Sequence, residues 1–105
     1  QYVNGVMQTN LHSVWDYYIV ADADLSTAVF ADRLADTGWP TSPDAMSPPG
    51  AWAGESCRLI DQRSLYPLSE ELDPVYLETF RPLAEQRIRQ AAYRLAFLLN
   101  HALAQ

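Results

Sequence analysis

His12 and Asp16 are the two residues of this sequence whose types and spacing point most directly to chemistry. Residues four apart on an α-helix share one face, so their imidazole and carboxylate groups can reach a common point. Both groups are ordinary zinc ligands, and a helix holds two such ligands without having to order a loop. The structural alternatives are a surface hydrogen bond between His12 and Asp16, or two solvated side chains. Spacing alone leaves these interpretations open.

The other side chains capable of chemistry favour structural roles. Glu55 has the residue type of a general base, but its place in a predicted helix favours a structural hydrogen bond. Cys57 is the only cysteine, so it permits no intrachain disulfide, and we expect it to be a small buried hydrophobe. We expect His101 at the surface near a helix C-terminus, where a cation is favoured. Arg58 and Arg94 are expected to pair with carboxylates between helices, and the alternative is contact with a phosphate.

A helix beginning at Leu11, with Asn10 as its N-cap, must position His12 and Asp16. Its apolar face has helical spacing and consists of Leu11, Val14, Trp15, Tyr18 and Ile19. We expect Tyr17 and Tyr18, which follow the aspartate, to take part in packing. A short extended segment at residues 2–6 is expected before this helix.

Three more helices are predicted. Asp24 is the expected N-cap of the second helix, which Gly38 and the following Trp-Pro pair terminate. The third helix is expected at about Ala51 to Gln62, after a proline-rich loop at residues 40–50. Residues 64–72 form a second expected loop. We therefore predict an all-α fold of antiparallel helices joined by Pro-rich loops.

Asp73 and Pro74 predict the start of the last helix, with aspartate at the N-cap and proline at the first helical position. Pro82 predicts a kink or a break near Phe80. The expected buried face comprises Ala84, Ile88, Ala91, Leu95, Leu98 and Ala102. Glu85 and Arg89 are expected to pair on the solvated side. The wide apolar arc suggests that this helix packs against more protein than these 105 residues supply.

Composition limits the possible functions. A chain of 105 residues is compatible with one domain, and 49% hydrophobic residues argue against disorder. The net charge is −6, and all seven basic residues are arginine, so no basic footprint for nucleic acid is present. An enzyme whose positive charge comes from bound metal ions is not excluded. No apolar run is long enough for a transmembrane helix, and residues 1–10 do not resemble a signal peptide.

Three segments carry a family resemblance, namely "NLHSVWD" at residues 10–16, "WAGES" at 52–56 and "YRLAFLLN" at 93–100. With "VNG" at residues 3–5, and with Tyr76 and Pro82 ahead of the last segment, they resemble the S1/P1 family of zinc-dependent nucleases, in the same order along the chain. The first segment is the most specific, because it combines histidine, tryptophan and aspartate at fixed positions.

The resemblance implies a phospholipase C/P1 nuclease-like helical fold in which His12 and Asp16 bind one ion of a three-zinc cluster. It implies hydrolysis of phosphodiester bonds in single-stranded DNA or RNA, in some members with removal of 3′-phosphates, and a secreted or periplasmic location. Met7 stands where some members place an aromatic residue that stacks on a base. Substrate-binding residues are therefore left unassigned, as are catalytic ones.

The sequence also departs from the family pattern. Family members have an N-terminal tryptophan and a GD-x-x-Q-P-L-H segment that supply further zinc ligands, and neither is present here. We therefore expect residues 1–105 to be a single helical unit, the C-terminal half of a larger catalytic domain. That unit would be inactive alone and would need the N-terminal half as its partner. The alternatives are a phospholipase C-type enzyme acting on lipid head groups and a non-enzymatic helical interaction module.

Overall fold

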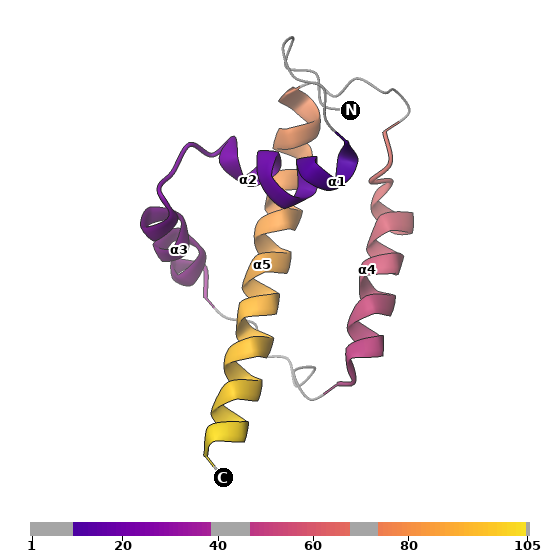
Figure 1. Cartoon of the computed structure of the whole chain (residues 1–105). Helices are drawn as coiled ribbons and strands as arrows, with labels where there is room; N and C mark the ends of the chain where they lie inside the picture. The colour runs from indigo at the N-terminus through magenta and orange to yellow at the C-terminus, as the bar shows by residue number, and fades with distance from the viewer. Residues whose placement is uncertain (1–9, 39–46, 68–73, 105) are drawn as a thin grey trace.

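The computed structural model describes residues 10–38, 47–67 and 74–104, and all its regular elements there are helical, as predicted (Figure 1). Four predicted features lie wholly or partly outside the described residues: the extended segment at residues 2–6, residues 40–46 of the first loop, residues 68–72 of the second loop and the N-cap at Asp73. The elements are α1 (Leu11–Ser13), η1 (Val14–Tyr18), α2 (Ile19–Ala21), α3 (Thr27–Asp36), α4 (Pro49–Arg63) and α5 (Pro74–Leu103).

The first helical segment begins at Leu11, as predicted, and Asn10 is its N-cap. The Asn10 Oδ1 accepts a hydrogen bond of 2.8 Å from the Ser13 backbone N–H. The middle of the segment is a π-helix, which the sequence analysis did not predict. The Ile19 N–H donates to the Val14 carbonyl five residues earlier, the pattern that defines a π-helix.

Two buried side chains give a physical reason for the π-helical turn. Val14 and Ile19 are both fully buried, and they are five residues apart. An α-helix brings residues three or four apart onto one face, whereas a π-helical turn does so for residues five apart. The π-helix therefore points both side chains at the core and leaves His12 and Asp16 exposed on another face.

The expected cap of the second helix is wrong. Asp24 has a φ of 53°, so it lies in the left-handed region at the end of the preceding segment. Its N–H donates to the Ala21 carbonyl, and aspartate tolerates this conformation better than most residues. Ser26 is the N-cap instead, and its hydroxyl accepts a hydrogen bond of 3.2 Å from the Val29 N–H. Helix α3 therefore begins at Thr27.

Helix α4 is longer at its N-terminus than predicted, since it begins at Pro49 rather than Ala51. Proline suits the first helical turn because the N–H that it lacks would have no intrahelical partner there. At the other end Ser64 adopts a left-handed conformation, with φ 52° and ψ 53°, and terminates the helix. None of the side chains of α4 is fully buried.

Helix α5 begins at Pro74 and continues through Pro82 to Leu103. The break that was one of the two outcomes predicted near Phe80 therefore does not occur. Proline removes one backbone hydrogen bond and crowds the preceding turn. Buried side chains on both sides of Pro82 compensate, because Leu77 and Phe80 precede it and Leu83 follows it within the same core.

The core lies where residues 11–21 cross the first half of α5 (Figure 1). Its buried members are Val14, Ile19, Leu77, Phe80, Leu83 and Ala84. The predicted buried face of α5 is correct at Ala84 and wrong further along, where Ile88, Leu95 and Leu98 are 38%, 58% and 42% exposed. Helix α4 runs beside that part of α5 but leaves a cavity between Trp52 and the two leucines, so Leu95 and Leu98 stay partly exposed.

Helices α3 and α4 lie on opposite sides of α5, and α4 runs antiparallel to it, as predicted (Figure 1). The predicted pair of Glu85 with Arg89 is wrong. Glu85 is buried and accepts a hydrogen bond of 2.9 Å from the Arg33 guanidinium, which ties α3 to α5. Asp22 and Arg81 form a second ion pair onto α5. No helix among the described residues combines the length and apolarity that crossing a membrane requires.

Candidate metal centre and the adjoining pocket

His12 and Asp16 come together as the spacing predicted. The His12 Nε2 and the Asp16 Oδ2 are 2.7 Å apart, a hydrogen-bonding distance, with side-chain exposures of 83% and 64%. His12 belongs to α1 and Asp16 to η1, so the pair spans the junction between the α-helical and π-helical turns. Short π-helical insertions within α-helices are frequent at functional sites.

The His12 imidazole and the Asp16 carboxylate are suited to two of the four ligand positions of a tetrahedral zinc ion. Ligand atoms bound to tetrahedral zinc at 2.0–2.1 Å lie roughly 3.3 Å from one another. The present separation of 2.7 Å would have to widen by about half an ångström, which a small side-chain rotation can supply. Within the described ranges, no group of three or more His, Cys, Asp or Glu side chains is placed to hold a metal ion. The pair could thus supply two ligands of one ion.

Trp15 lies between the two candidate ligands in the sequence, and Tyr76 holds its indole ring in place. Its indole Nε1–H donates a 3.0 Å hydrogen bond to the Tyr76 hydroxyl, and that hydroxyl donates a 2.6 Å hydrogen bond to the Leu65 carbonyl. The Trp15 and Tyr76 rings both pack on Phe80, with centroid distances of 5.8 Å and 4.7 Å. Burial raises the pKa of Tyr76. The hydroxyl therefore stays protonated at neutral pH and can donate.

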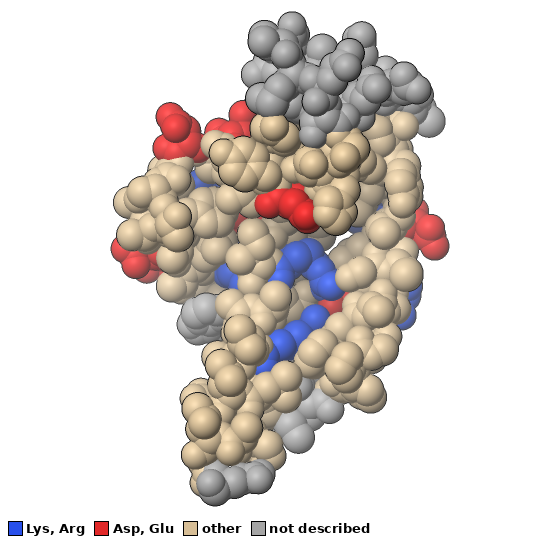
Figure 2. All heavy atoms as spheres, viewed as in Figure 1, with Lys and Arg blue, Asp and Glu red and all other residues tan. Residues whose placement is uncertain are grey.

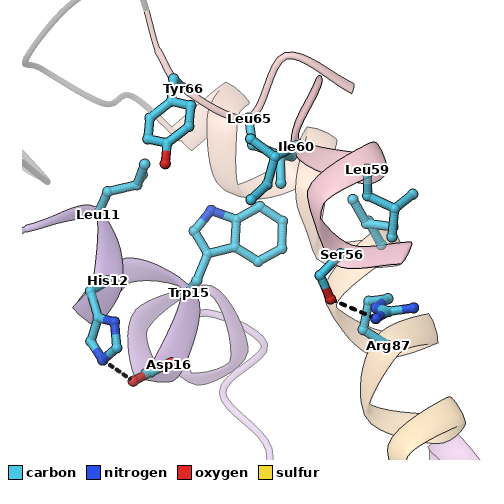
Figure 3. Close-up of a pocket in the computed structure, with 11 residues that line it drawn as sticks. Leu11, His12, Trp15, Asp16, Ser56, Leu59, Ile60, Leu65, Tyr66 and Arg87 are labelled. Atoms are coloured by element: carbon cyan, nitrogen blue, oxygen red, sulfur yellow. Dashed lines mark hydrogen bonds and ion pairs between the residues drawn. The ribbon is translucent and has the colours of Figure 1, made fainter. Parts of the chain in front are cut away.

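A cavity of about 410 Å³ opens beside the pair (Figure 3). Trp15, Leu59, Ile60, Leu65 and Leu83 contribute most of its apolar wall. In Figure 3, His12 and Asp16 lie at one side and the Ser56–Arg87 hydrogen bond lies at the other, with Trp15 between them. Ligand pockets commonly have this size and this combination of apolar walls with a few polar groups.

A second cavity of about 390 Å³ lies further along the same two helices, between Trp52 on α4 and Leu95 and Leu98 on α5. Ser56 and Arg87 line both cavities, so their 2.9 Å hydrogen bond lies on the boundary between them. Figure 2 shows arginine side chains in this hollow between α4 and α5, whereas most of the visible acidic side chains lie on the outer surface.

Glu55 is a structural anion rather than a free base. Both of its carboxylate oxygens accept 3.0 Å hydrogen bonds from Arg94, and Arg87 forms a second ion pair with it. Mainly because of the Arg94 hydrogen bonds, with Arg87 adding to them against the cost of burial, the pKa of Glu55 falls from its ordinary value of 4.5 to about 2. The Arg94 guanidinium also lies 5.0 Å from the Trp52 ring centroid. The predicted interhelical role of Arg94 is confirmed.

Other candidates are placed as follows. Cys57 is exposed, so its expected burial is wrong: it lies on the solvent side of a helix that buries no side chain fully. His101 is exposed, as expected, and stacks on Phe97 with an interplanar angle of 5°. Tyr17 is 63% exposed, with its ring edge-on to Tyr18, because the π-helical turn directs it outward. Arg58 forms no ion pair with other residues of the described ranges.

Sequence reasoning did not assign roles to Tyr76, Tyr66 or Arg87. In the sequence, Tyr76 stood out only as part of the family pattern. Its hydroxyl joins three segments that are distant in sequence, so local patterns could not predict its contacts. Tyr66 follows α4 and reaches the first cavity, and nothing in its local sequence indicates this.

The described residues form an all-helical arrangement with an exposed His–Asp pair. Comparison with known families matches residues 2–104 to S1/P1 Nuclease, and the chain belongs to this family. A search of curated proteins found no match. The family is zinc-dependent, and its membership implies hydrolysis of phosphodiester bonds in nucleic acids.

Proposed function

We propose that this chain is the C-terminal half of an exported S1/P1-type nuclease that cleaves single-stranded DNA or RNA, with His12 and Asp16 binding one of its zinc ions. The observation that carries the proposal is the convergence of the His12 Nε2 and Asp16 Oδ2 on an exposed helical face. Family membership supports zinc as the metal and a phosphodiester as the substrate.

The two residues act as ligands in this proposal, not as a general acid or base. A zinc cluster supplies a hydroxide at neutral pH and stabilises negative charge on the phosphate. The chain's own part is to hold the imidazole and the carboxylate on one rigid turn. Asn10 starts that turn, and the buried Val14 and Ile19 set its rotation. A site with two protein ligands has too few for normal zinc affinity, so the N-terminal half is proposed to complete it.

The charge of the chain supports a role for zinc in attracting the substrate. The chain carries a net charge of −6, which repels a polyanion. The two arginines that line the hollow, Arg87 and Arg94, both form ion pairs with Glu55. Bound zinc would then supply the positive charge that attracts the phosphate.

The test is to measure zinc content and cleavage of single-stranded DNA in the complete domain carrying His12→Ala or Asp16→Ala. We expect each variant to lose one zinc ion per chain and nearly all activity. His101→Ala is the matched control, because it removes the other histidine of this chain from an exposed position on α5. Full zinc content with unchanged turnover in His12→Ala would refute the assignment.

A further inference from the structure

The hydroxyl of Tyr76 occupies the only point among the described residues where Trp15 and Leu65 are joined by hydrogen bonds. It accepts from the Trp15 indole at 3.0 Å and donates to the Leu65 carbonyl at 2.6 Å. A single hydroxyl is needed for this, because the group must accept on one side and donate on the other. Three parts of the chain meet there: the π-helical turn, the second residue after α4 and the first turn of α5.

The π-helical turn needs such a fixed point. Its backbone pattern is rarer and less favourable than that of an α-helix, so tertiary contacts must maintain it. Val14 and Ile19 fix one face of the turn by burial. Trp15 lies on another face, immediately before Asp16, and its ring is half-buried against Phe80. The indole hydrogen bond limits how far the turn can rotate or revert to an α-helix.

We propose that Tyr76 is a positioning residue for the metal site, because its hydroxyl locks Trp15 and thereby the rotation of the turn that presents His12 and Asp16. The inference rests on the proposed zinc function in one respect only, that the pair binds zinc. The locking of the turn itself can be measured without metal. Phenylalanine at position 76 keeps the ring packing on Phe80 and removes only the hydroxyl, so Tyr76→Phe isolates the bridge.

The first measurement uses the complete domain without metal. Hydrogen exchange by NMR is compared between wild type and Tyr76→Phe for the Trp15 indole N–H and the backbone amides of residues 14–18. We expect exchange at these positions to become about tenfold faster, in line with the loss of a part-buried hydrogen bond. Amides of α3 should be unchanged. Unaltered exchange at residues 14–18 would overturn the proposal.

The second measurement is a zinc sulfate titration of the complete domain, followed by the ring proton signals of His12, with those of His101 as the internal reference in the same spectrum. We expect the zinc Kd to rise about tenfold in Tyr76→Phe, the lower end of the effect of outer contacts on metal sites. Two controls separate positioning from general destabilisation. Tyr93→Phe removes a hydroxyl elsewhere on α5, and Leu34→Ala weakens the packing of α3; both should keep the wild-type Kd.

The outcomes distinguish the two proposals. An unchanged Kd in Tyr76→Phe, with faster exchange, would reduce Tyr76 to a purely structural residue and overturn the positioning role. A Kd raised equally by Leu34→Ala would overturn it as well. If zinc shifts no His12 signal in the wild type, the proposed metal function fails, and the exchange measurement alone then decides whether Tyr76 locks the turn.

Discussion

Glu55 and Arg94 form a two-pronged ion pair between α4 and α5, with both N–O distances at 3.0 Å. The guanidinium is 6% exposed and the carboxylate 26% exposed, so the pair is shielded on the α5 side and reaches solvent on the α4 side. Paired, planar contacts of this kind are among the stronger interactions between charged side chains. Together with Arg87, this pair is the main polar connection between the two helices in the described residues.

We expect the ion pair to make the chain acid-sensitive. The pKa of Glu55 is depressed to about 2, whereas in the unfolded chain it returns to its ordinary value of 4.5. The stabilisation is therefore present above pH 4.5 and is lost as the pH falls from there towards 2. Its upper bound is about 3 kcal/mol. Denaturant unfolding at a series of pH values should show this loss in wild type and not in Glu55→Gln; parallel pH profiles would contradict it.

Replacing Arg94 should cost more than replacing an exposed arginine. Arg94→Leu leaves Glu55 with only Arg87 and removes the cation above the Trp52 ring. We expect a loss of about 3 kcal/mol in the free energy of unfolding, as for other broken buried pairs. Arg63→Leu, at the exposed end of α4, is the control and should change it by less than about 0.5 kcal/mol. Equal losses in urea titrations would argue against the interhelical pair.

Truncating a leucine should destabilise the chain strongly near the start of α5 and little near its end. Leu77 is 1% exposed within the core, so Leu77→Ala should lower the free energy of unfolding by about 2–5 kcal/mol. Leu103 is 79% exposed, and Leu103→Ala should change it by about 0.5 kcal/mol or less. Thermal unfolding followed by circular dichroism measures both. A large loss at Leu103 would show that the end of α5 is covered in solution.

The N-cap that starts the first helical segment can be tested directly. Asn10→Ala removes the acceptor of the Ser13 N–H and should cost about 1 kcal/mol, whereas Asn10→Asp keeps an acceptor and should cost little. The exchange of amide protons in residues 11–14 should accelerate only in the alanine variant. Identical exchange in the two variants would exclude a capping role for this side chain.

The sequence predicted the helical fold, the start of the first helix and the pairing of His12 with Asp16, because these depend on local spacing. It could not predict features set by distant contacts. The π-helical turn follows from the joint burial of Val14 and Ile19 against α5. Glu85 faces Arg33 rather than solvent because α3 folds back onto α5. Such partners are 52 residues apart, and no local pattern reports them.

The N-cap of α3 also could not be predicted from local sequence alone. Asp24 and Ser26 are both good N-cap residues, and they differ by two positions. The choice falls to Ser26 because the preceding segment ends with Asp24 in the left-handed conformation, where it cannot start a helix. The apolar stripe of α5 has the same limit. Leu77 and Leu83 are buried in the core, whereas Leu95 and Leu98 border a cavity beside α4, and spacing alone does not distinguish these two environments.

Helix α4 buries none of its side chains fully, and cavities lie on both sides of its hydrogen bond to Arg87. Cooperative unfolding units are defined by the apolar contacts that their residues share, and α4 shares few of them. We therefore expect backbone amides of α4 to exchange faster than those of residues 11–21. Because Leu59 and Ile60 line the first cavity and Trp52 and Ala53 line the second, opening of α4 would remove one wall of each cavity.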